Sequence, residues 1–196
     1  MSTIWKELIP SGLLDERIKV LARGVQSYID DSRTPVVLAI VTQGGTRIGM
    51  ELVKLLKPET YHWGLIGTGS YGSHETGGSV NLQFNRLGPI AGKRVVIVDD
   101  IGDRRATLKY LQDYFLGPEK AVEVRNCVLL NKPSRQECNV PLHWVGFNIP
   151  NTFVAGFGLD GGEGFSFTRN YPEIRYKDGS LDLSQPKYWL PDKLPA

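Results

Sequence analysis

Three carboxylates lie close together in the segment VVIVDDIGDRRAT, residues 95–107. Asp99 and Asp100 follow a run of apolar residues that predicts a buried strand, and Asp103 lies in the loop beyond it. Carboxylates at this spacing repel one another, so a fold keeps them together only where positive charge compensates. Mg²⁺ bound with a polyphosphate ester and a ribose diol would supply that charge, which makes these aspartates candidate ligands.

The residues after the third carboxylate suit a phosphate group. Thr107 begins a predicted helix, and the backbone amides and dipole at a helix N-terminus attract anions. We therefore expect a phosphate to be held by Arg104, Arg105, Ala106 and Thr107. Two other interpretations stay open: another Mg²⁺-phosphoryl site, such as the acidic pocket of a response regulator, and simple capping of the helix by the aspartates.

The elements around this segment alternate between strands and helices. Apolar runs predict strands over residues 36–41, 61–68, 80–84, 95–98, 122–130 and 144–149, and a short one over 153–157. Helical spacing of apolar residues predicts helices over residues 14–29, 48–56 and 107–115. This order indicates an α/β fold: a mostly parallel central sheet with helices on both faces, followed after Leu159 by a small C-terminal cap.

Other polar or glycine-rich segments follow the predicted strands. They are Gln43-Gly44-Gly45, Ser70-Tyr71 and Lys132. Ligands of open α/β sheets bind beyond the carboxyl ends of the strands. The convergence of these segments with the acidic one therefore predicts a ligand cleft at that edge of the sheet.

The bulk composition excludes several classes of protein. A chain of 196 residues fits one domain, residues 1–196, and its two cysteines are too few for a disulfide framework or a four-ligand zinc site. The net charge of +2, with Lys and Arg scattered, gives no argument for nucleic-acid binding. No apolar stretch approaches the roughly 18 residues of a membrane helix, and no secretory signal is present. We expect a soluble cytoplasmic protein that binds neither nucleic acid nor membrane.

The acidic segment resembles the phosphoribosyl diphosphate motif of type I phosphoribosyltransferases, in which four apolar residues and two acids precede Asp-Thr-Gly-x-Thr. The likeness runs from about residue 8 to residue 169 and is greatest to the hypoxanthine-guanine branch. Its longest match, WVGFNIPNTFVAGFGLD, is similar to the purine-binding strand and segment of that branch. Residues 42–45 stand in place of the family's diphosphate loop, and Ser70-Tyr71-Gly72 in place of its mobile loop.

The resemblance implies how the donor, phosphoribosyl diphosphate, is held. Asp99 and Asp100 would hold the ribose hydroxyls, directly or through Mg²⁺, and Asp160 would help to hold the Mg²⁺ that neutralises the leaving diphosphate. The diphosphate loop would present backbone amides to that group, because glycine allows a close approach. Arg169 would meet the diphosphate from the tail. Residues 69–78 would act as a lid that excludes water from the reacting ribose.

The resemblance also assigns the purine site. Asp103 would lie beside N7 of the purine and serve as the acid/base group. Lys132 would donate to O6, which selects 6-oxopurines because an amino group there could not accept that bond. Phe153 would stack on the base. Backbone atoms near Val154 and Asp160 would surround the 2-position of the base.

The chain departs from the family pattern at Arg104 and Arg105, where the family has Thr-Gly. An arginine with a positive φ would cost about 1 kcal/mol or more. We therefore expect the loop to take another shape, with a guanidinium replacing the lost amide contacts to phosphate. Gln43 also stands where the branch often carries Lys, which removes one charge.

These observations favour a purine salvage phosphoribosyltransferase that needs Mg²⁺ and uses phosphoribosyl diphosphate and a purine base. The alternatives are a non-catalytic or regulatory nucleotide-binding member of the same fold, which the arginine pair favours, and a phosphoryl-transfer or response-regulator-like protein. Because this fold commonly associates, we expect a homodimer or homotetramer. The segment 186–191 could pack on a neighbouring subunit. About residues 145–196 would form the base-binding segment and tail.

Overall fold

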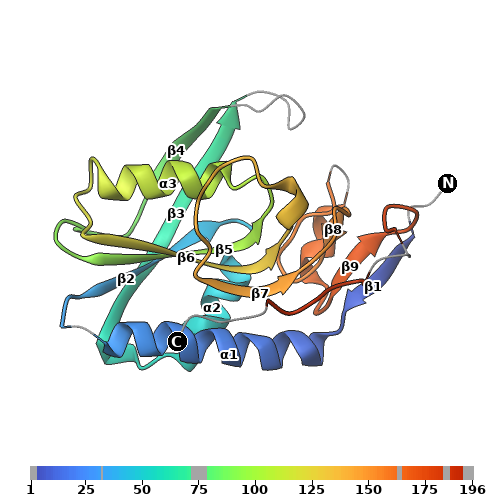
Figure 1. The fold of residues 1–196 in the computed structure, drawn as a ribbon, viewed down its shortest axis with the longest axis horizontal. Coiled ribbons are helices and arrows are strands. Elements are labelled where there is room, and N and C mark those ends of the chain that lie inside the picture. Colours follow the sequence, from blue (N-terminus) through green and yellow to red (C-terminus); the bar gives the residue numbers. More distant parts are fainter. Residues whose placement is uncertain (1–3, 32, 72–78, 163–164, 183–185, 192–196) are drawn as a thin grey trace.

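A six-stranded sheet forms the centre of the molecule. The computed structural model describes residues 4–31, 33–71, 79–162, 165–182 and 186–191. The strand order is β4-β3-β2-β5-β6-β7 (Figure 1). The strands are β2 (Val36–Thr42), β3 (Tyr61–Tyr71), β4 (Ser79–Asn85), β5 (Arg94–Gly102), β6 (Glu123–Asn131) and β7 (Trp144–Asn148). Every neighbouring pair is parallel except β3 with β4, so the predicted mostly parallel sheet is confirmed.

Helices cover both faces of this sheet (Figure 1). Helices α1 (Ser11–Asp30) and α2 (Thr46–Leu55) pack on one face, and α3 (Ala106–Leu116) packs on the other. The side chains of β2 alternate between the two cores: Leu38 joins α1 and α2, whereas Val37 joins α3. This alternation explains the unbroken apolar run in β2, because a strand covered on both faces has no polar side.

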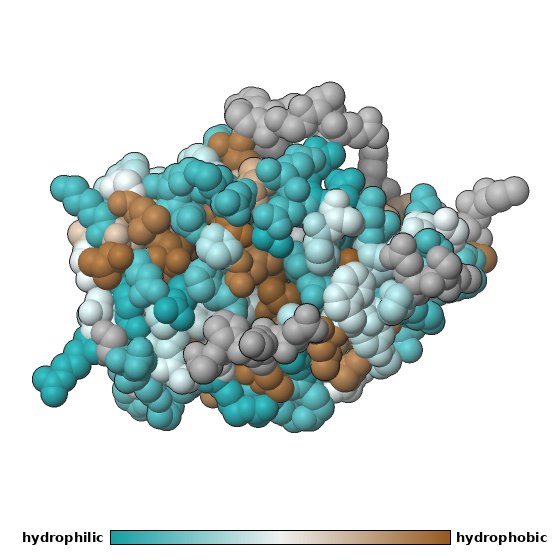
Figure 2. Space-filling model, viewed as in Figure 1, coloured by the Kyte–Doolittle hydropathy of each residue, from teal (hydrophilic) through white to brown (hydrophobic). Residues whose placement is uncertain are grey.

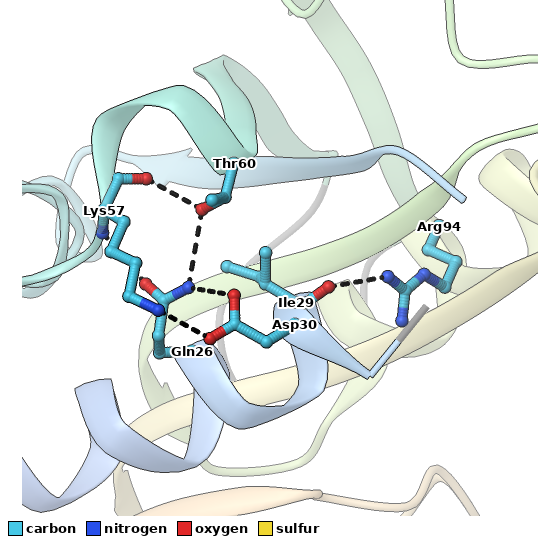
Figure 3. A network of polar contacts seen from close by, with 6 residues as sticks. All are labelled: Gln26, Ile29, Asp30, Lys57, Thr60 and Arg94. Atoms are coloured by element: carbon cyan, nitrogen blue, oxygen red, sulfur yellow. Dashed lines mark hydrogen bonds and ion pairs between the residues drawn. The ribbon is translucent and has the colours of Figure 1, made fainter. Parts of the chain in front are cut away.

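The C-terminal end of α1 is tied to the start of β5. Arg94, which is 4 % exposed, donates to the backbone oxygens of Tyr28 at 2.8 Å and Ile29 at 3.1 Å. Lys57 Nζ lies 2.9 Å from Asp30 Oδ2 on the other side of the same helix end (Figure 3). Cations near the last carbonyls of a helix are favourable for its dipole. These contacts fix the beginning of the strand that carries the acidic segment at its other end.

A second, three-stranded sheet lies beside the carboxyl ends of the central strands (Figure 1). It joins β1 (Trp5–Ile9), β9 (Ile174–Lys177) and β8 (Val154–Ala155) in antiparallel pairs, and we call it the hood. The predicted C-terminal cap is thus present, but it includes an N-terminal strand that the sequence pattern did not predict. The short strand expected over residues 153–157 is only two residues long.

Element boundaries differ from the predictions at β3. This strand continues through Gly69, Ser70 and Tyr71 and pairs there with β4, so the predicted lid does not begin at residue 69. Residues 72–78 of that lid lie outside the described residues. Short 3-10 turns complete the described elements: η1 (Pro58–Thr60), η2 (Pro133–Arg135) and η3 (Ser166–Asn170).

The tail segment 186–191 lies on the free edge of β7 in its own chain. Trp189 and Asn148 exchange backbone hydrogen bonds of 3.0 and 2.9 Å, and Tyr188 meets Phe147 edge to face. Packing on a neighbouring subunit stays a prediction. On the face drawn in Figure 2, hydrophobic residues form several separate patches among hydrophilic ones. Within the described residues, no helix is both long and apolar enough to cross a membrane.

Candidate active site

A cleft of about 1140 Å³ opens at the carboxyl ends of the central strands. The predicted site residues that line it are Gly44, Asp99, Asp100, Asp103, Arg104, Arg105, Ala106, Thr107, Lys132, Phe153, Asp160 and Arg169. Three of the four strand-end segments that the sequence analysis named, at Gly44, residues 99–107 and Lys132, therefore line the same cleft.

Asp99 and Asp100 form the acidic floor of the cleft at the end of β5. Asp99 is 8 % exposed, and its Oδ1 accepts a 2.9 Å hydrogen bond from the Asp100 amide. Burial, with the neighbouring charge of Asp100, raises the pKa of Asp99 well above its ordinary value. Burial also raises the pKa of Asp100, against the opposing positive charge of Arg169. The pair is therefore a place where added positive charge is favourable.

This carboxylate pair fits Mg²⁺ that is shared with a substrate. Mg²⁺ usually takes one or two protein carboxylates and completes its shell with phosphate oxygens and water. Among the described residues, no group of three or more His, Cys, Asp or Glu side chains could hold a metal ion. The donor set thus suits an ion that arrives with a phosphate ligand better than a metal held by the protein alone.

The double-glycine loop after β2 packs directly against the acidic pair. A Cβ atom on Gly44 would lie 1.7 Å from Asp100 Oδ2, and one on Gly45 would lie 2.9 Å from the Asp99 Cα. Only glycine allows this approach, which brings the loop backbone to the carboxylates. The Thr42–Gln43 peptide bond is cis. Gln43 is exposed, and neither Gln43 nor Gly45 lines the cleft itself.

Asp103 is held between two cations. Its Oδ2 lies 3.3 Å from Lys132 Nζ, and its Oδ1 lies 2.8 Å from Arg135 Nε. Lys132 is 6 % exposed, and burial lowers its pKa although the charge of Asp103 opposes that shift. Sequence reasoning paired neither residue with Asp103 and missed Arg135 altogether. The only sequence signal for Arg135 was its position shortly after Lys132, in the turn Pro133–Arg135 that begins directly after that lysine.

The loop at residues 103–107 corrects one expectation. Arg105 has φ 64° and ψ 14°, so it adopts the left-handed conformation that glycine favours, which the arginine was expected to avoid. Its guanidinium donates to Val140 O at 2.9 Å and to Asn131 Oδ1 at 3.1 Å. The Arg105 side chain is therefore bonded to the protein at both terminal nitrogens. The Arg104 side chain pairs with Glu137 at 3.3 Å.

Arg169 reaches the cleft from the tail. Its guanidinium donates to Asp160 Oδ2 at 2.7 Å and to Gly158 O at 2.6 Å. Arg169 lies in the turn Ser166–Asn170, and its side chain lines the cleft. The geometry therefore brings Asp160 and Arg169 together, while their roles toward Mg²⁺ and the diphosphate stay predictions.

The hood provides the aromatic wall of the cleft. Phe153 is 47 % exposed, and Trp5 lies behind it with ring centroids 6.1 Å apart and planes tilted by 43°. Val154 is 5 % exposed in β8 and does not line the cleft. The side chains of Ser70 and Tyr71 lie outside what the structure describes. Thr42, Asn151 and Thr152 also line the cleft and belong to segments that the resemblance indicated. Lining residues to which the sequence assigned no role are Val41, Thr68, Ile101, Leu108, Arg135, Gly162 and Ser166.

Comparison with known proteins gives the class that this fold and cleft define. The pattern of the family described as "Phosphoribosyl transferase domain" matches residues 12–161. The chain belongs to the phosphoribosyltransferase family, and its predicted α/β fold and class of enzyme are confirmed.

Particular relatives place it near one branch of that family. It is 33 % identical over 154 residues to the hypoxanthine phosphoribosyltransferase of Salmonella typhimurium, covering 78 % of this chain and 85 % of that protein. The crystal structure of a hypoxanthine-guanine phosphoribosyltransferase from Bacillus anthracis superposes with a TM-score of 0.77 at 32 % identity, over 87 % of this chain and 97 % of that one. A Trypanosoma cruzi hypoxanthine phosphoribosyltransferase gives 0.78 at 27 % identity, over 89 % and 95 %. The resemblance to the hypoxanthine-guanine branch is confirmed.

Proposed function

We propose that this chain transfers ribose 5-phosphate from phosphoribosyl diphosphate to a 6-oxopurine, hypoxanthine or guanine, in purine salvage. The products are the nucleoside monophosphate and diphosphate. The observation that carries the proposal is the contact of 3.3 Å between the buried Lys132 ammonium and the Asp103 carboxylate. A 6-oxopurine presents an acceptor, O6, and a donor, N7–H, on one edge. A donor and an acceptor side by side in the cleft complement that edge.

Asp103 would take the proton during the reaction. The bond between ribose C1′ and the diphosphate oxygen breaks, and its electron pair leaves on the diphosphate. Purine N9 then forms the new bond to C1′, and the proton on N7 passes to Asp103. Lys132 and Arg135 hold this carboxylate from both sides, so its position toward N7 is fixed before the base arrives.

The donor would lie along the acidic floor. Asp99 and Asp100 would bind the ribose hydroxyls, and the amides of residues 104–107 at the start of α3 would bind the 5′-phosphate. Residues 43–45, with Arg169, would receive the diphosphate, and the backbone at Ser70 and Tyr71 would border it from β3. Mg²⁺, when bound, would neutralise the leaving diphosphate, and the residues that would hold it are Asp99, Asp100 and Asp160.

The base would lie between the Lys132–Asp103 pair and the hood. Phe153 would stack on its face, since the exposed ring borders the cleft and is backed by Trp5. Backbone atoms near Val154 and Asp160 would meet the 2-position of the base.

We further propose that the chain acts in the cytoplasm as a homodimer or homotetramer. Sedimentation or gel filtration would test the oligomeric state.

The test is release of diphosphate from phosphoribosyl diphosphate and Mg²⁺ with hypoxanthine, guanine, xanthine or adenine. We expect turnover with hypoxanthine or guanine and none with adenine, because the adenine amino group cannot accept from Lys132. Asp103→Asn should lower kcat by about 10²–10⁴-fold. If inosine monophosphate binds but no base turns over, the chain is instead a nucleotide-binding member of the family without this activity.

A further inference from the structure

Arg105 stands where the resembling motif has glycine, yet its backbone keeps the left-handed conformation, with φ 64° and ψ 14°. A side chain makes this conformation unfavourable because the Cβ crowds the following carbonyl oxygen. A residue other than glycine persists there only where its surroundings hold it. The hydrogen bonds of the Arg105 side chain show which residues keep it in this conformation.

Both bonded ends of the Arg105 guanidinium reach acceptors that are fixed in the core. Nη1 donates to the backbone oxygen of Val140 at 2.9 Å, and Nη2 donates to Asn131 Oδ1 at 3.1 Å. Val140 is fully buried and Asn131 is 6 % exposed. Hydrogen bonds from a charged donor are stronger than neutral ones, so these two bonds favour one position of the arginine.

The acceptors are themselves part of a larger support. Asn131, the last residue of β6, donates from Nδ2 to Asn148 Oδ1 at the end of β7, at 2.7 Å. On the loop side, the backbone oxygen of Arg104 accepts from the amides of Glu137 and Cys138 at 3.3 and 3.2 Å. The loop is therefore attached to two strand ends and to the segment 137–140.

The same loop begins α3. The Arg105 backbone oxygen accepts from Lys109 N at 2.9 Å and so starts the helical hydrogen bonds. The first amides of a helix have no partner within it, and Ala106 and Thr107 line the cleft. The conformation of Arg105 thus decides where these amides point, while its guanidinium is bonded on the side of β6.

We infer that Arg105 is a positioning residue for the phosphate-binding loop and not a ligand of the phosphate. Its guanidinium holds residues 103–107 in the conformation that glycine takes without a side chain. This inference rests on the proposed function, which places the 5′-phosphate at these amides. It explains how the chain can replace the glycine of the motif without changing the course of the loop.

The test compares Arg105→Ala with Arg105→Gly. Alanine removes the anchor and keeps the unfavourable conformation, whereas glycine removes the anchor but tolerates a positive φ. By calorimetry, we expect Arg105→Ala to bind ribose 5-phosphate and inosine monophosphate about tenfold more weakly than the wild type, as the loss of a charged hydrogen bond predicts. Arg105→Gly should bind them with an affinity between those two proteins. KM for phosphoribosyl diphosphate should follow the same order, while KM for hypoxanthine stays unchanged.

Other outcomes overturn the inference. If Arg105 contacted the phosphate, both variants would lose affinity equally; if it were only structural, both would lower Tm and leave the affinities unchanged. The control is Arg23→Ala, which removes an exposed arginine of α1. Failure of the proposed function gives a different result. If the wild type binds ribose 5-phosphate but releases no diphosphate, the proposed function is wrong, while the binding comparison of the Arg105 variants still tests the positioning role. A wild type that binds neither phosphate ligand overturns both.

Discussion

The two sides of the cleft are built in different ways. The side that we propose for the donor, here called the donor side, comes mainly from the end of β5, its following loop and the loop after the adjacent β2, so these parts lie on neighbouring parallel strands. The side that we propose for the base, here called the base side, depends on the hood, where Trp5 from the start of the chain lies behind Phe153. Adjacent strand ends form the first side, whereas distant segments of the chain form the second.

The energetics differ as well. The donor side holds buried carboxylates whose ionisation is unfavourable. Burial and the charge of Asp100 raise the pKa of Asp99, so the ionised form of Asp99 lowers the stability of the folded state. The base side holds aromatic rings whose packing stabilises the fold, with Trp5 touching both Phe153 and Phe165. On the donor side, therefore, a carboxylate proposed for function lowers the stability of the folded state. On the base side, the aromatic rings proposed for function also stabilise the fold. Three substitutions test this difference.

The largest effect is expected from Gly44→Ala on the donor side. Its Cβ would lie 1.7 Å from Asp100 Oδ2, so the carboxylate must turn away from its place. We expect kcat/KM for phosphoribosyl diphosphate to fall by about 10²-fold, the effect of a displacement near 1 Å in a reacting site. Gly12→Ala is the matched control, because a Cβ there meets nothing within 4 Å. Unchanged kinetics in Gly44→Ala would show that the loop does not need its contact with Asp100.

A smaller effect is expected from Trp5→Ala on the base side. Without the Trp5 ring behind it, Phe153 loses its fixed position. KM for hypoxanthine should then rise about tenfold, which corresponds to the upper end of the interaction free energy of an aromatic pair. Tm should fall at the same time, while KM for the donor stays unchanged. Trp5→Phe keeps a ring and should restore most of both losses. A rise in donor KM equal to that for hypoxanthine would mean that the two sides are not independent.

The smallest change in stability is expected from Asp99→Asn, and it is a rise. Because the pKa of Asp99 is higher in the folded state, the folded state binds its proton more tightly and stability falls as pH rises. At neutral pH, removing the charge should therefore raise Tm by about 2–4 °C, which corresponds to 1 kcal/mol in a chain of this size. Activity should be lost.

The pH dependence provides the check on this last substitution. As the pH falls below the raised pKa, Asp99 of the folded wild type takes up its proton and the difference in Tm should shrink. It should disappear only below the ordinary pKa of an aspartate, where the unfolded state is protonated as well. Thermal unfolding of both proteins across that range measures it. If the variant is less stable than the wild type at neutral pH, ionised Asp99 does not lower the stability of the folded state.

The donor side could be predicted from the sequence because its signals are local. The apolar run before Asp99 predicted the strand that became β5. The glycines after β2 were expected to let the backbone approach a diphosphate, and the structure shows that Gly44 packs closely against Asp100. The conformation of Arg105 could not be predicted. Arginine disfavours a positive φ, and the bonds that support it come from residues 131 and 140, which the fold brings near.

The sequence by itself predicted the mostly parallel sheet and the acidic strand end, since these depend on residue types within short segments of the chain. The candidate roles of Asp103 and Lys132 came from the family resemblance and stay predictions. Only the tertiary structure decided that Arg135 joins Asp103, that β1 completes the hood and that Trp5 supports Phe153. These contacts join segments that are separated in the chain. Their geometry follows from how the sheet and hood pack together, which no local pattern of residues records.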